Sequence, residues 1–413
     1  MAKQLPQLLK GFRDFLPQEQ MARKKIISKI SEVFERFGFA PLDTPALEYY
    51  ELLGGKYGDE GEKLMYKFKD QGGRMVALRY DLTVPLSRVV VNYPELPKPF
   101  KRYQIASVWR AENPQKGRYR EFMQCDADIV GSDSIVADAE VVTTFAAAFK
   151  ALEIGEVKVR FNDRRLVDQV LGKLKVSKKQ AVGFLRTIDK IDKLGKQKVL
   201  ELLKDEGFDK KLMEDYESAM DALGKNFVEE FEELLGSFGV ANIEFDKYLA
   251  RGLDYYTGTI FEFVLKDKPE FGSIAGGGRY DNLIQDGKGQ SIPAVGCSIG
   301  LDRMLAALSE MGVIAPQTAA EVLVMNLDKN LTAEYLNICT NLREANIDCE
   351  FYYEPAKLDK QFKFAQAKNI QVAVIYGPNE AKSRKANVKN LVEKKQVTVD
   401  LEDLATEIKS MLW

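Results

Sequence analysis

The sequence predicts an α/β protein with an α+β core of antiparallel strands flanked by helices, and three patterns along the chain support this fold class. Residues 101–131 alternate as strands do, with one interruption at "ENPQKG". Between about residues 166 and 239, Lys, Glu, Leu and Asp recur with helical periodicity, which indicates a helical insertion. Beyond Pro316, strand and helix patterns alternate, as in a separate α/β domain. We therefore expect a core at 1–315 that contains the insertion at 166–239, followed by a domain at 318–413.

The first part of the chain predicts a helix, a strand-like segment and a strand that leads into a helix. Apolar residues recur at three- and four-residue spacing over residues 26–37, which indicates an amphipathic helix stopped by the glycine that follows. The segment 39–53, "FAPLDTPALEYYELL", is strand-like. Residues 73–93 predict a strand entering a helix, with Asp81 and Thr83 near the junction. Side chains at such a junction can cap the helix or bind a ligand.

Strand patterns return after the insertion and continue to the C-terminal domain. In the core they fall at 255–265, in the glycine-rich segment 272–284, and at 294–312, where a strand runs into a helix. In the last domain the expected order is strand 321–327, helix 332–345, strand 348–353, helix 358–369 and strand 372–377.

The composition describes a globular chain that lacks one residue type. With 413 residues and 45% hydrophobic content, it can bury the cores of two or three domains. Its 60 basic and 62 acidic side chains leave a net charge of −2, so any nucleic-acid contact must come from local patches. Four scattered cysteines and no histidine argue against a structural zinc site and remove the most common general base. Without a secretory segment or eighteen consecutive apolar residues, we expect a cytoplasmic protein with no membrane partner.

The stretch "RAENPQKGRYREFMQCDAD", which ends at Asp128, predicts a hairpin with one polar face. If residues 100–112 and 118–130 are antiparallel strands joined by "NPQKG", Gln124, Asp126 and Asp128 share one face and apolar residues occupy the other. Such a polar face can simply be solvated, since antiparallel sheets often face water. In a chain of this size, however, a second layer can cover it.

Basic residues gather on and beside the predicted turn. Arg110, Lys116, Arg118 and Arg120 suit a polyphosphate, because a guanidinium group can donate two parallel hydrogen bonds to phosphate oxygens. Glu112 beside them could accept a hydrogen bond from an exocyclic amine. Neither G-x-x-x-x-G-K-[ST] nor G-x-G-x-x-G occurs in the chain. The pattern therefore favours a nucleotide held by arginines on an antiparallel sheet.

These motifs carry a family resemblance. "VWRAENPQKGRYREFMQCDADIVG", together with "RGLDYYTG", "AGGGRY" and "GCSIGLDR", resembles the histidyl-tRNA synthetases, which are class II aminoacyl-tRNA synthetases. The resemblance extends from "KGFRDFLP" to the C-terminal "LDKQFKFAQAKNIQVAVIYG". It implies a class II catalytic core and an anticodon-binding domain in a homodimer. It also implies ATP-dependent ligation of L-histidine to tRNA(His) through a histidyl-adenylate, with Mg²⁺ bound mainly through ATP.

The resemblance also implies roles for individual residues. Arg110 and Arg251 match the arginines that act on the α-phosphate and near the reacting carboxylate. The residues expected to bind ATP are Arg110, Glu112, Arg118 and Arg303. Those expected to bind histidine are Asp81, Thr83, Gln124, Asp128, Arg251, Tyr255, Tyr256 and Tyr280. Gln115 and Lys116 are expected near the tRNA acceptor end.

The implied chemistry needs no histidine side chain, because a substrate carboxylate is already a nucleophile and attacks the α-phosphate directly. Two alternatives remain open. The first is a non-catalytic paralogue that binds histidine as a regulatory subunit, which the complete arginine set and the C-terminal domain disfavour. The second is a class II synthetase for glycine, threonine or proline, which "RGLDYYTG" disfavours.

Overall fold

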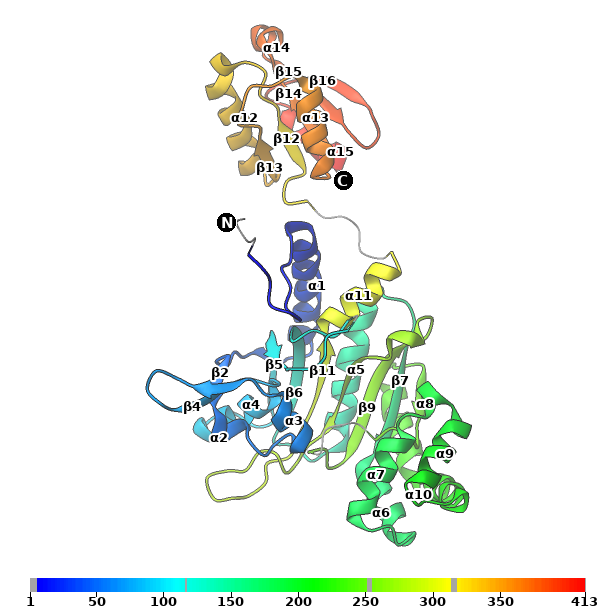
Figure 1. The fold of residues 1–413 in the computed structure, drawn as a ribbon. Coiled ribbons are helices and arrows are strands. Elements are labelled where there is room, and N and C mark those ends of the chain that lie inside the picture. The colour runs from blue at the N-terminus through cyan, green and yellow to red at the C-terminus, as the bar shows by residue number, and fades with distance from the viewer. Residues whose placement is uncertain (1–5, 116, 251–254, 313–317, 413) are drawn as a thin grey trace, which may run out of the picture. The chain divides into compact units, whose positions relative to one another are not determined.

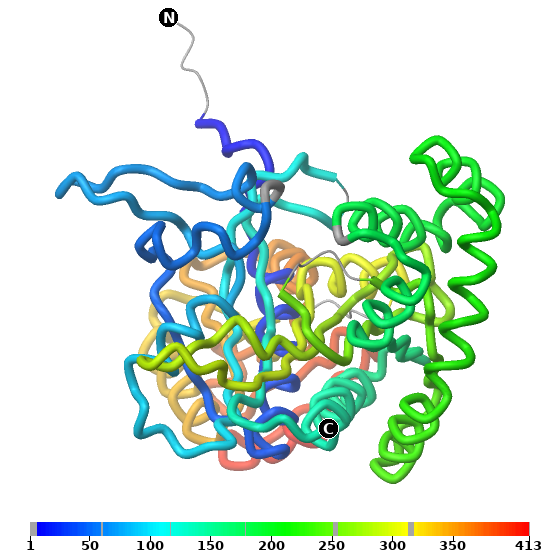
Figure 2. The backbone as a smooth tube through the Cα atoms, turned by 90° about the horizontal axis from the view of Figure 1, so that it is seen from below, coloured from blue at the N-terminus to red at the C-terminus, as the bar shows by residue number. Residues whose placement is uncertain are grey.

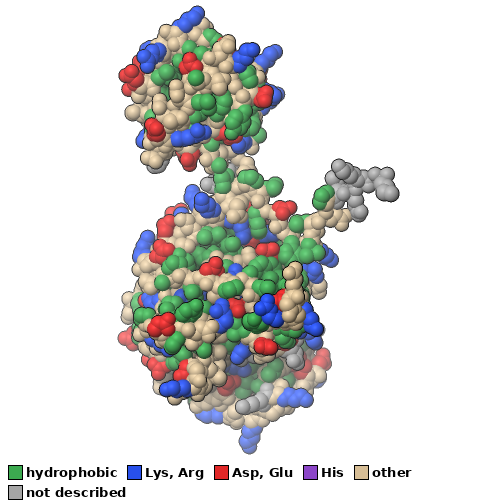
Figure 3. All heavy atoms as spheres, turned by 90° about the vertical axis from the view of Figure 1, so that its left-hand side faces the viewer, with side chains coloured by type: hydrophobic (Ala, Val, Ile, Leu, Met, Phe, Trp, Pro, Cys, Tyr) green, Lys and Arg blue, Asp and Glu red, His purple; other side chains and the backbone are tan. Residues whose placement is uncertain are grey.

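The computed structural model describes residues 6–115, 117–250, 255–312 and 318–412 (Figure 1). The chain forms two compact units, which consist of residues 1–14 with 25–313 and of residues 15–24 with 314–413. On the face drawn in Figure 3, basic and acidic side chains are interspersed over both units, as a net charge of −2 leads one to expect. No helix in the described part of the chain is long and apolar enough to cross a membrane.

The larger unit is built on an eight-stranded sheet in the order β1-β5-β6-β11-β10-β9-β7-β8. The six central strands pair antiparallel, which confirms the predicted sheet. The short edge strands β1 and β8 pair parallel with β5 and β7. Both reach the sheet through long connections that contain helices, and such connections permit parallel pairing. The strands are β1 Ala40–Pro41, β5 Phe100–Trp109, β6 Glu121–Val130, β7 Val157–Asp163, β8 Ile243–Phe245, β9 Thr259–Leu265, β10 Ser273–Arg279 and β11 Ala294–Gly300.

Helices and a small second sheet surround these strands. Phe34 of helix α1 (Pro17–Arg36) packs on Tyr103 of β5 and on Phe145 of α5 (Ile135–Ala151), with ring centroids 5.7 and 5.1 Å apart. This contact confirms the apolar face expected from the spacing over 26–37. The expected strand–helix pair at 73–93 is β4 (Met75–Leu78) and α4 (Thr83–Asn92), and 294–312 forms β11 and α11 (Leu301–Glu310). The other elements around the sheet are β2 (Leu47–Tyr49), α2 (Tyr50–Leu53), α3 (Gly58–Leu64) and β3 (Lys67–Lys69).

Between β7 and β8 the chain forms a group of helices with its own apolar core. Buried side chains of this group, such as Phe184, Met213 and Tyr216, pack together. Figure 2 shows these helices in green at one side of the sheet, away from the blue strands β2 and β4. The helices are α6 (Arg164–Lys173), α7 (Lys178–Ile188), α8 (Ile191–Leu194), α9 (Lys196–Asp205) and α10 (Lys210–Ser237).

The smaller unit contains a five-stranded sheet in the order β13-β12-β14-β15-β16. Its first five elements confirm the order expected from the sequence, and the parallel strands β12, β13 and β14 supply a buried apolar core. A short helix, two antiparallel strands and a closing helix follow, which the sequence patterns did not predict. The elements are β12 (Val322–Val324), α12 (Thr332–Glu344), β13 (Cys349–Phe351), α13 (Leu358–Ala367), β14 (Val372–Ile375), α14 (Pro378–Ser383), β15 (Lys385–Asn390), β16 (Gln396–Asp400) and α15 (Leu404–Leu412).

Candidate active site

A cavity of about 740 Å³ lies on the polar face of the large sheet. The hairpin β5–β6, the strands β10 and β11 and the starts of α4 and α11 contribute its walls. Every described residue to which family resemblance gave a role lines it: Asp81, Thr83, Arg110, Glu112, Gln115, Arg118, Gln124, Asp128, Tyr255, Tyr256, Tyr280 and Arg303. Arg120, which the turn pattern grouped with the polyphosphate-binding arginines, is not part of this lining, and its guanidinium donates to the carbonyl oxygens of Glu112 and Lys10. The two other predicted residues, Lys116 and Arg251, lie outside the described residues.

The loop of the hairpin is longer than the sequence suggested, because β5 ends at Trp109 and β6 begins only at Glu121. Beyond the strands, the Arg110 backbone N–H still donates to the carbonyl oxygen of Arg120 at 2.9 Å. Gly117 takes a left-handed conformation with φ +72°, which glycine adopts without a steric cost. The backbone and side chain of Arg303 lie closest to the space beside Gly117, so this loop approaches the start of α11.

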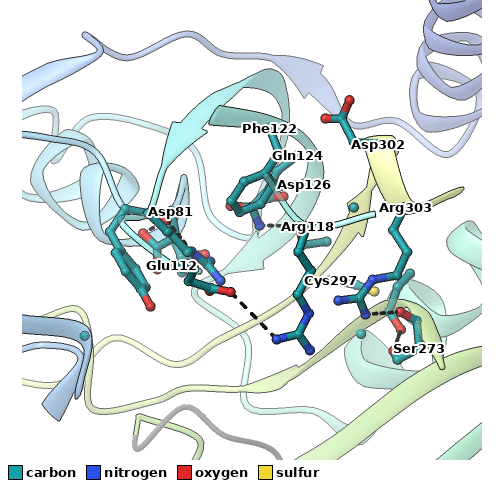
Figure 4. Close-up of a pocket in the computed structure, with 18 of the residues that line it drawn as sticks. Asp81, Glu112, Arg118, Phe122, Gln124, Asp126, Ser273, Cys297, Asp302 and Arg303 are labelled. Carbon is teal, nitrogen blue, oxygen red and sulfur yellow. Dashed lines mark hydrogen bonds and ion pairs between the residues drawn. The ribbon is translucent and has the colours of Figure 1, made fainter. Parts of the chain in front are cut away.

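This approach places Arg118 and Arg303 at the same end of the cavity, as Figure 4 shows. Arg118 Nη1 lies 3.7 Å from a carboxylate oxygen of Glu112. Arg303 Nη1 donates to the carbonyl oxygen of Ser273 at 2.8 Å. Two guanidinium groups on one wall have the chemistry to bind an anion with several oxygens.

Arg110 packs against two aromatic rings. Its guanidinium carbon lies 4.3 Å from the centroid of the Tyr80 ring and 5.2 Å from that of Phe122. Its Nε donates to the carbonyl oxygen of Tyr80 at 3.0 Å. These contacts fix the plane of a cation before any ligand arrives, which reduces the cost of reorganisation when charge develops nearby.

Acidic side chains line another part of the wall. Asp81 Oδ1 accepts hydrogen bonds from the backbone N–H groups of Thr83 and Val84 at 3.2 and 3.0 Å, and so caps the start of α4. It also accepts from the hydroxyl of Tyr57 at 2.9 Å. Burial raises the pKa of Asp81, and these hydrogen bonds oppose that shift. No sequence pattern pointed to Tyr57.

Asp128 is held by one partner on β5 and one just beyond β10. It forms an ion pair with Arg102 of β5 at 2.7 Å and accepts a short hydrogen bond from the hydroxyl of Tyr280. Gly296 stands directly opposite on β11, where a Cβ atom would overlap the Asp128 carboxylate. The glycine of "GCSIGLDR" therefore makes room for this side chain. Burial raises the pKa of Asp128, and Arg102 opposes the shift.

Gln124 and Asp126 complete the polar face of β6 predicted from the two-residue period. Gln124 Nε2 donates to the hydroxyl of Ser298 at 2.6 Å, and this hydroxyl also hydrogen-bonds to Asp126. Asp126 is 2% exposed and lines the cavity. Burial raises its pKa to about 8. The sequence pattern placed Asp126 on this face but gave it no role, and Arg102 was missed.

Aromatic side chains enclose this acidic part of the cavity. Tyr255 lies 5.0 Å from Tyr256 and 5.9 Å from Tyr280, measured between ring centroids. Burial raises the pKa values of Tyr255 and Tyr280 well above the ordinary value, so both hydroxyls stay protonated near neutral pH. The cavity thus joins an arginine-lined part to a part with three carboxylates and aromatic walls.

Comparison with known proteins places this site in a family. Residues 11–304 match the family model described as histidyl-tRNA synthetase. The chain belongs to the histidyl-tRNA synthetase family. Residues 321–411 match the model of an anticodon-binding domain, so the smaller unit is an anticodon-binding domain of the α/β type.

Relatives in this family resemble the chain over nearly its full length. A histidine–tRNA ligase of Rhodopirellula baltica is 40% identical, with 95% of both chains covered, and one of Aeropyrum pernix is 40% identical, with both chains fully covered. The crystal structure of histidyl-tRNA synthetase from Nostoc superposes with a TM-score of 0.86 at 31% identity, covering 99% of this chain and 100% of that chain. The likeness therefore includes both units.

Proposed function

We propose that the chain ligates L-histidine to tRNA(His), using ATP to form a histidyl-adenylate first. Full-length likeness to histidine–tRNA ligases supports this proposal. The observation that carries it is the cavity itself, in which Arg118 and Arg303 suit the phosphates of ATP and the carboxylates suit an amino acid that carries a positive charge. A regulatory paralogue that only binds histidine would have no use for the arginine-lined part.

In the activation step, the histidine carboxylate attacks the α-phosphate of ATP and pyrophosphate leaves. We assign Arg110, preoriented by Tyr80 and Phe122, to the α-phosphate, where it offsets the negative charge of the transition state. Arg118 and Arg303 hold the γ-phosphate, and Glu112 accepts from the adenine amine. We assign Arg251 to the reacting carboxylate on family resemblance, since it lies outside the described residues.

The acidic part of the cavity orients histidine for this attack. We assign Asp81, Thr83 and Gln124 to its amino group, and Asp128 and Tyr256 to its imidazole ring, which Tyr255 and Tyr280 flank. Among the described residues no three His, Cys, Asp or Glu side chains cluster as a metal site. Mg²⁺ would therefore be held mainly by the phosphate oxygens of ATP, where it neutralises charge.

For the transfer step, we propose that residues 318–413 read the anticodon and that Gln115 and Lys116 approach the acceptor end of the tRNA. Residues 1–315 form the catalytic core in this proposal, with the helical insertion at 166–239. Family resemblance further suggests a homodimer that works in the cytoplasm. The anticodon-binding match of the smaller unit supports the tRNA assignment.

An ATP–pyrophosphate exchange assay with each of the twenty amino acids tests the proposal. Histidine alone should support exchange, and tRNA(His) should then become charged. Histidine binding without any exchange would place the chain with the regulatory paralogues. Exchange with glycine, threonine or proline would place it with another class II specificity.

A further inference from the structure

Four acceptor oxygens on the cavity wall have no hydrogen-bond partner among the described residues, and one of them, Asp128 Oδ2, is ion-paired with Arg102 at 2.7 Å. The other three are Asp81 Oδ2, Gln124 Oε1 and Asp126 Oδ1. Their side chains are only 3%, 8% and 2% exposed, and all three line the cavity. Buried acceptors are rarely left unsatisfied, because they lose their bonds to water without replacement. These oxygens therefore indicate a ligand with several donors.

The protein fixes each of the three side chains through its other polar atom. Asp81 Oδ1 is bound by Tyr57 and the start of α4, at 2.9 to 3.2 Å. The Ser298 hydroxyl holds both Gln124, at 2.6 Å, and Asp126. The unpartnered oxygens are consequently preorganised and cannot turn to satisfy one another without breaking these bonds. Figure 4 shows Gln124 and Asp126 close together on the cavity wall, with Asp81 on a neighbouring part of it.

The charge around these oxygens favours a cation. Asp126 interacts unfavourably with both Asp128 and Asp81, because each of these carboxylates raises its pKa. Two buried arginines act on Asp126, and both are already engaged. Arg102 is paired with Asp128 at 2.7 Å and donates to the carbonyl oxygen of Leu82 at 3.1 Å. Arg79 donates to the carbonyl oxygens of Ser107 and Thr44. A primary ammonium group carries one positive charge and three N–H donors, one for each of the three acceptor oxygens that have no partner.

We propose that Asp126 is a third acceptor for the ammonium group of the bound amino acid, together with Asp81 and Gln124. The inference rests on the proposed function, which supplies an α-amino acid as the substrate, and it gives a role to a residue that family resemblance left without one. Asp126 thereby becomes a specificity-determining residue that selects amino acids over their des-amino analogues. A site that has buried acceptors rejects a ligand without the matching donors strongly.

Binding of the ammonium group changes the protonation state of Asp126. Burial raises the pKa of Asp126 to about 8, so near pH 7 the free protein holds a proton on this carboxyl group. As the ammonium N–H···O⁻ bond forms, that proton passes to the buffer. Five charged or titratable groups interact with Asp126. They are Arg79 just after β4, Asp81 just before α4, Arg102 on β5, Asp128 on β6, and Tyr255. All of these groups belong to the protein, so they surround Asp126 whether or not the ligand carries an amino group.

Calorimetric titration with L-histidine and with imidazolepropionic acid, which lacks only the amino group, tests the inference. Asp126→Asn should weaken histidine binding about 10- to 100-fold, the usual loss for one hydrogen bond between charged groups. It should change the binding of imidazolepropionic acid less than about twofold. Asp133→Asn is a matched control, because it removes the same charge from an exposed position just beyond β6.

The unaltered protein provides a second measurement. Titrations with histidine at pH 7 in two buffers with different ionisation enthalpies should reveal more proton release from the unaltered protein than from Asp126→Asn. Equal losses for both ligands in Asp126→Asn, or equal proton release from the two proteins with histidine, would overturn the inference. Failure of the unaltered protein to bind histidine would instead refute the proposed function.

Discussion

Arg102 and Asp128 stand directly opposite each other on β5 and β6 and form an ion pair of 2.7 Å in which both side chains are buried. The same arginine acts on Asp126 and donates to the carbonyl oxygen of Leu82, just before α4. Arg102 therefore connects the buried carboxylates of Asp126 and Asp128 to the start of α4, the helix that carries Thr83. We infer that Arg102 positions the amino-acid site without touching the substrate.

The first prediction concerns the cost of losing this arginine. Arg102→Met leaves two buried carboxylates without their cation, so we expect the free energy of unfolding to fall by about 3–5 kcal/mol. Urea unfolding at pH 7.5 measures this free energy of unfolding. Arg74→Met is the control, because its ion pair with Asp70 is also 2.7 Å long but its side chain is 61% exposed. That change should cost less than about 1 kcal/mol, and equal costs would contradict the role given to Arg102.

The register of this pair follows from the ends of the predicted strands, although no sequence pattern pointed to Arg102. Strands that end at Glu112 and begin at Arg118 set these two residues opposite each other, and the same register pairs Arg102 with Asp128, as observed. Strand periodicity also placed Gln124 and Asp126 on the polar face. Local patterns thus predicted the central sheet, the polar strand face and the first five elements of the smaller unit.

Contacts between distant segments could not be predicted in this way. Tyr57 reaches Asp81, and Ser298 reaches Gln124 from a strand 174 residues away. The approach of Gly117 to Arg303 likewise depends on how the hairpin loop folds back on α11. Such contacts are set by tertiary packing, and neither two-residue nor 3.6-residue periodicity contains them.

The second prediction tests Arg110 as a group that stabilises the transition state. Arg110→Ala should lower the rate of pyrophosphate exchange by about two to three orders of magnitude, the usual loss when one preorganised donor is removed. Histidine affinity should stay within about threefold, because the side chain is assigned to the phosphate. Stopped-flow kinetics and calorimetry separate the two quantities.

Arg74→Ala provides a control for this prediction, since that exposed side chain pairs with Asp70 and is not part of the cavity lining. Exchange should then be unchanged. If Arg110→Ala instead weakens histidine binding as much as it slows exchange, Arg110 acts on the amino acid or on the fold of the site.

The third prediction concerns pH. The pKa of Asp126 is about 8 in the folded protein, above the ordinary value of 3.8, so between these pH values the folded protein holds more protons than the unfolded chain. Its contribution to stability is therefore greatest at low pH and decreases as the pH rises from about 4 to 8, by at most about 1.4 kcal/mol per pH unit. Urea unfolding at pH 6, 7 and 8 should reveal a steeper decline in the unaltered protein than in Asp126→Asn.

Saturating histidine should flatten this decline, because the ammonium group favours the ionised carboxylate. Asp246, whose pKa is about 6, shifts in the same direction but lies outside the cavity lining, so its contribution remains in both proteins. Parallel curves for the unaltered protein and Asp126→Asn would show that Asp126 ionises normally in the folded state.

The last prediction starts from the absence of histidine in 413 residues, where ordinary usage gives about ten. The proposed activation step assigns no role to a histidine side chain, since its nucleophile is a substrate carboxylate and its cations are arginines. A chain that charges tRNA(His) and contains no histidine can be translated after charged tRNA(His) has run out. Natural selection for this property is one explanation for the absence of histidine. The two others are a source organism that uses little histidine and a sequence that was redesigned to lack it.

Selection predicts that other proteins of the same organism use histidine at ordinary frequency and that synthesis of this chain continues during histidine starvation. Pulse labelling measures that synthesis, and Gln366→His, at an exposed position of α13, is a matched control whose synthesis should fall under the same starvation while its exchange activity is kept. A count of histidines across the proteome distinguishes selection on this chain from low histidine usage in the source organism. A deficit shared by most proteins would remove the case for selection on this chain, because the absence would then reflect general usage and not the reaction that the chain catalyses.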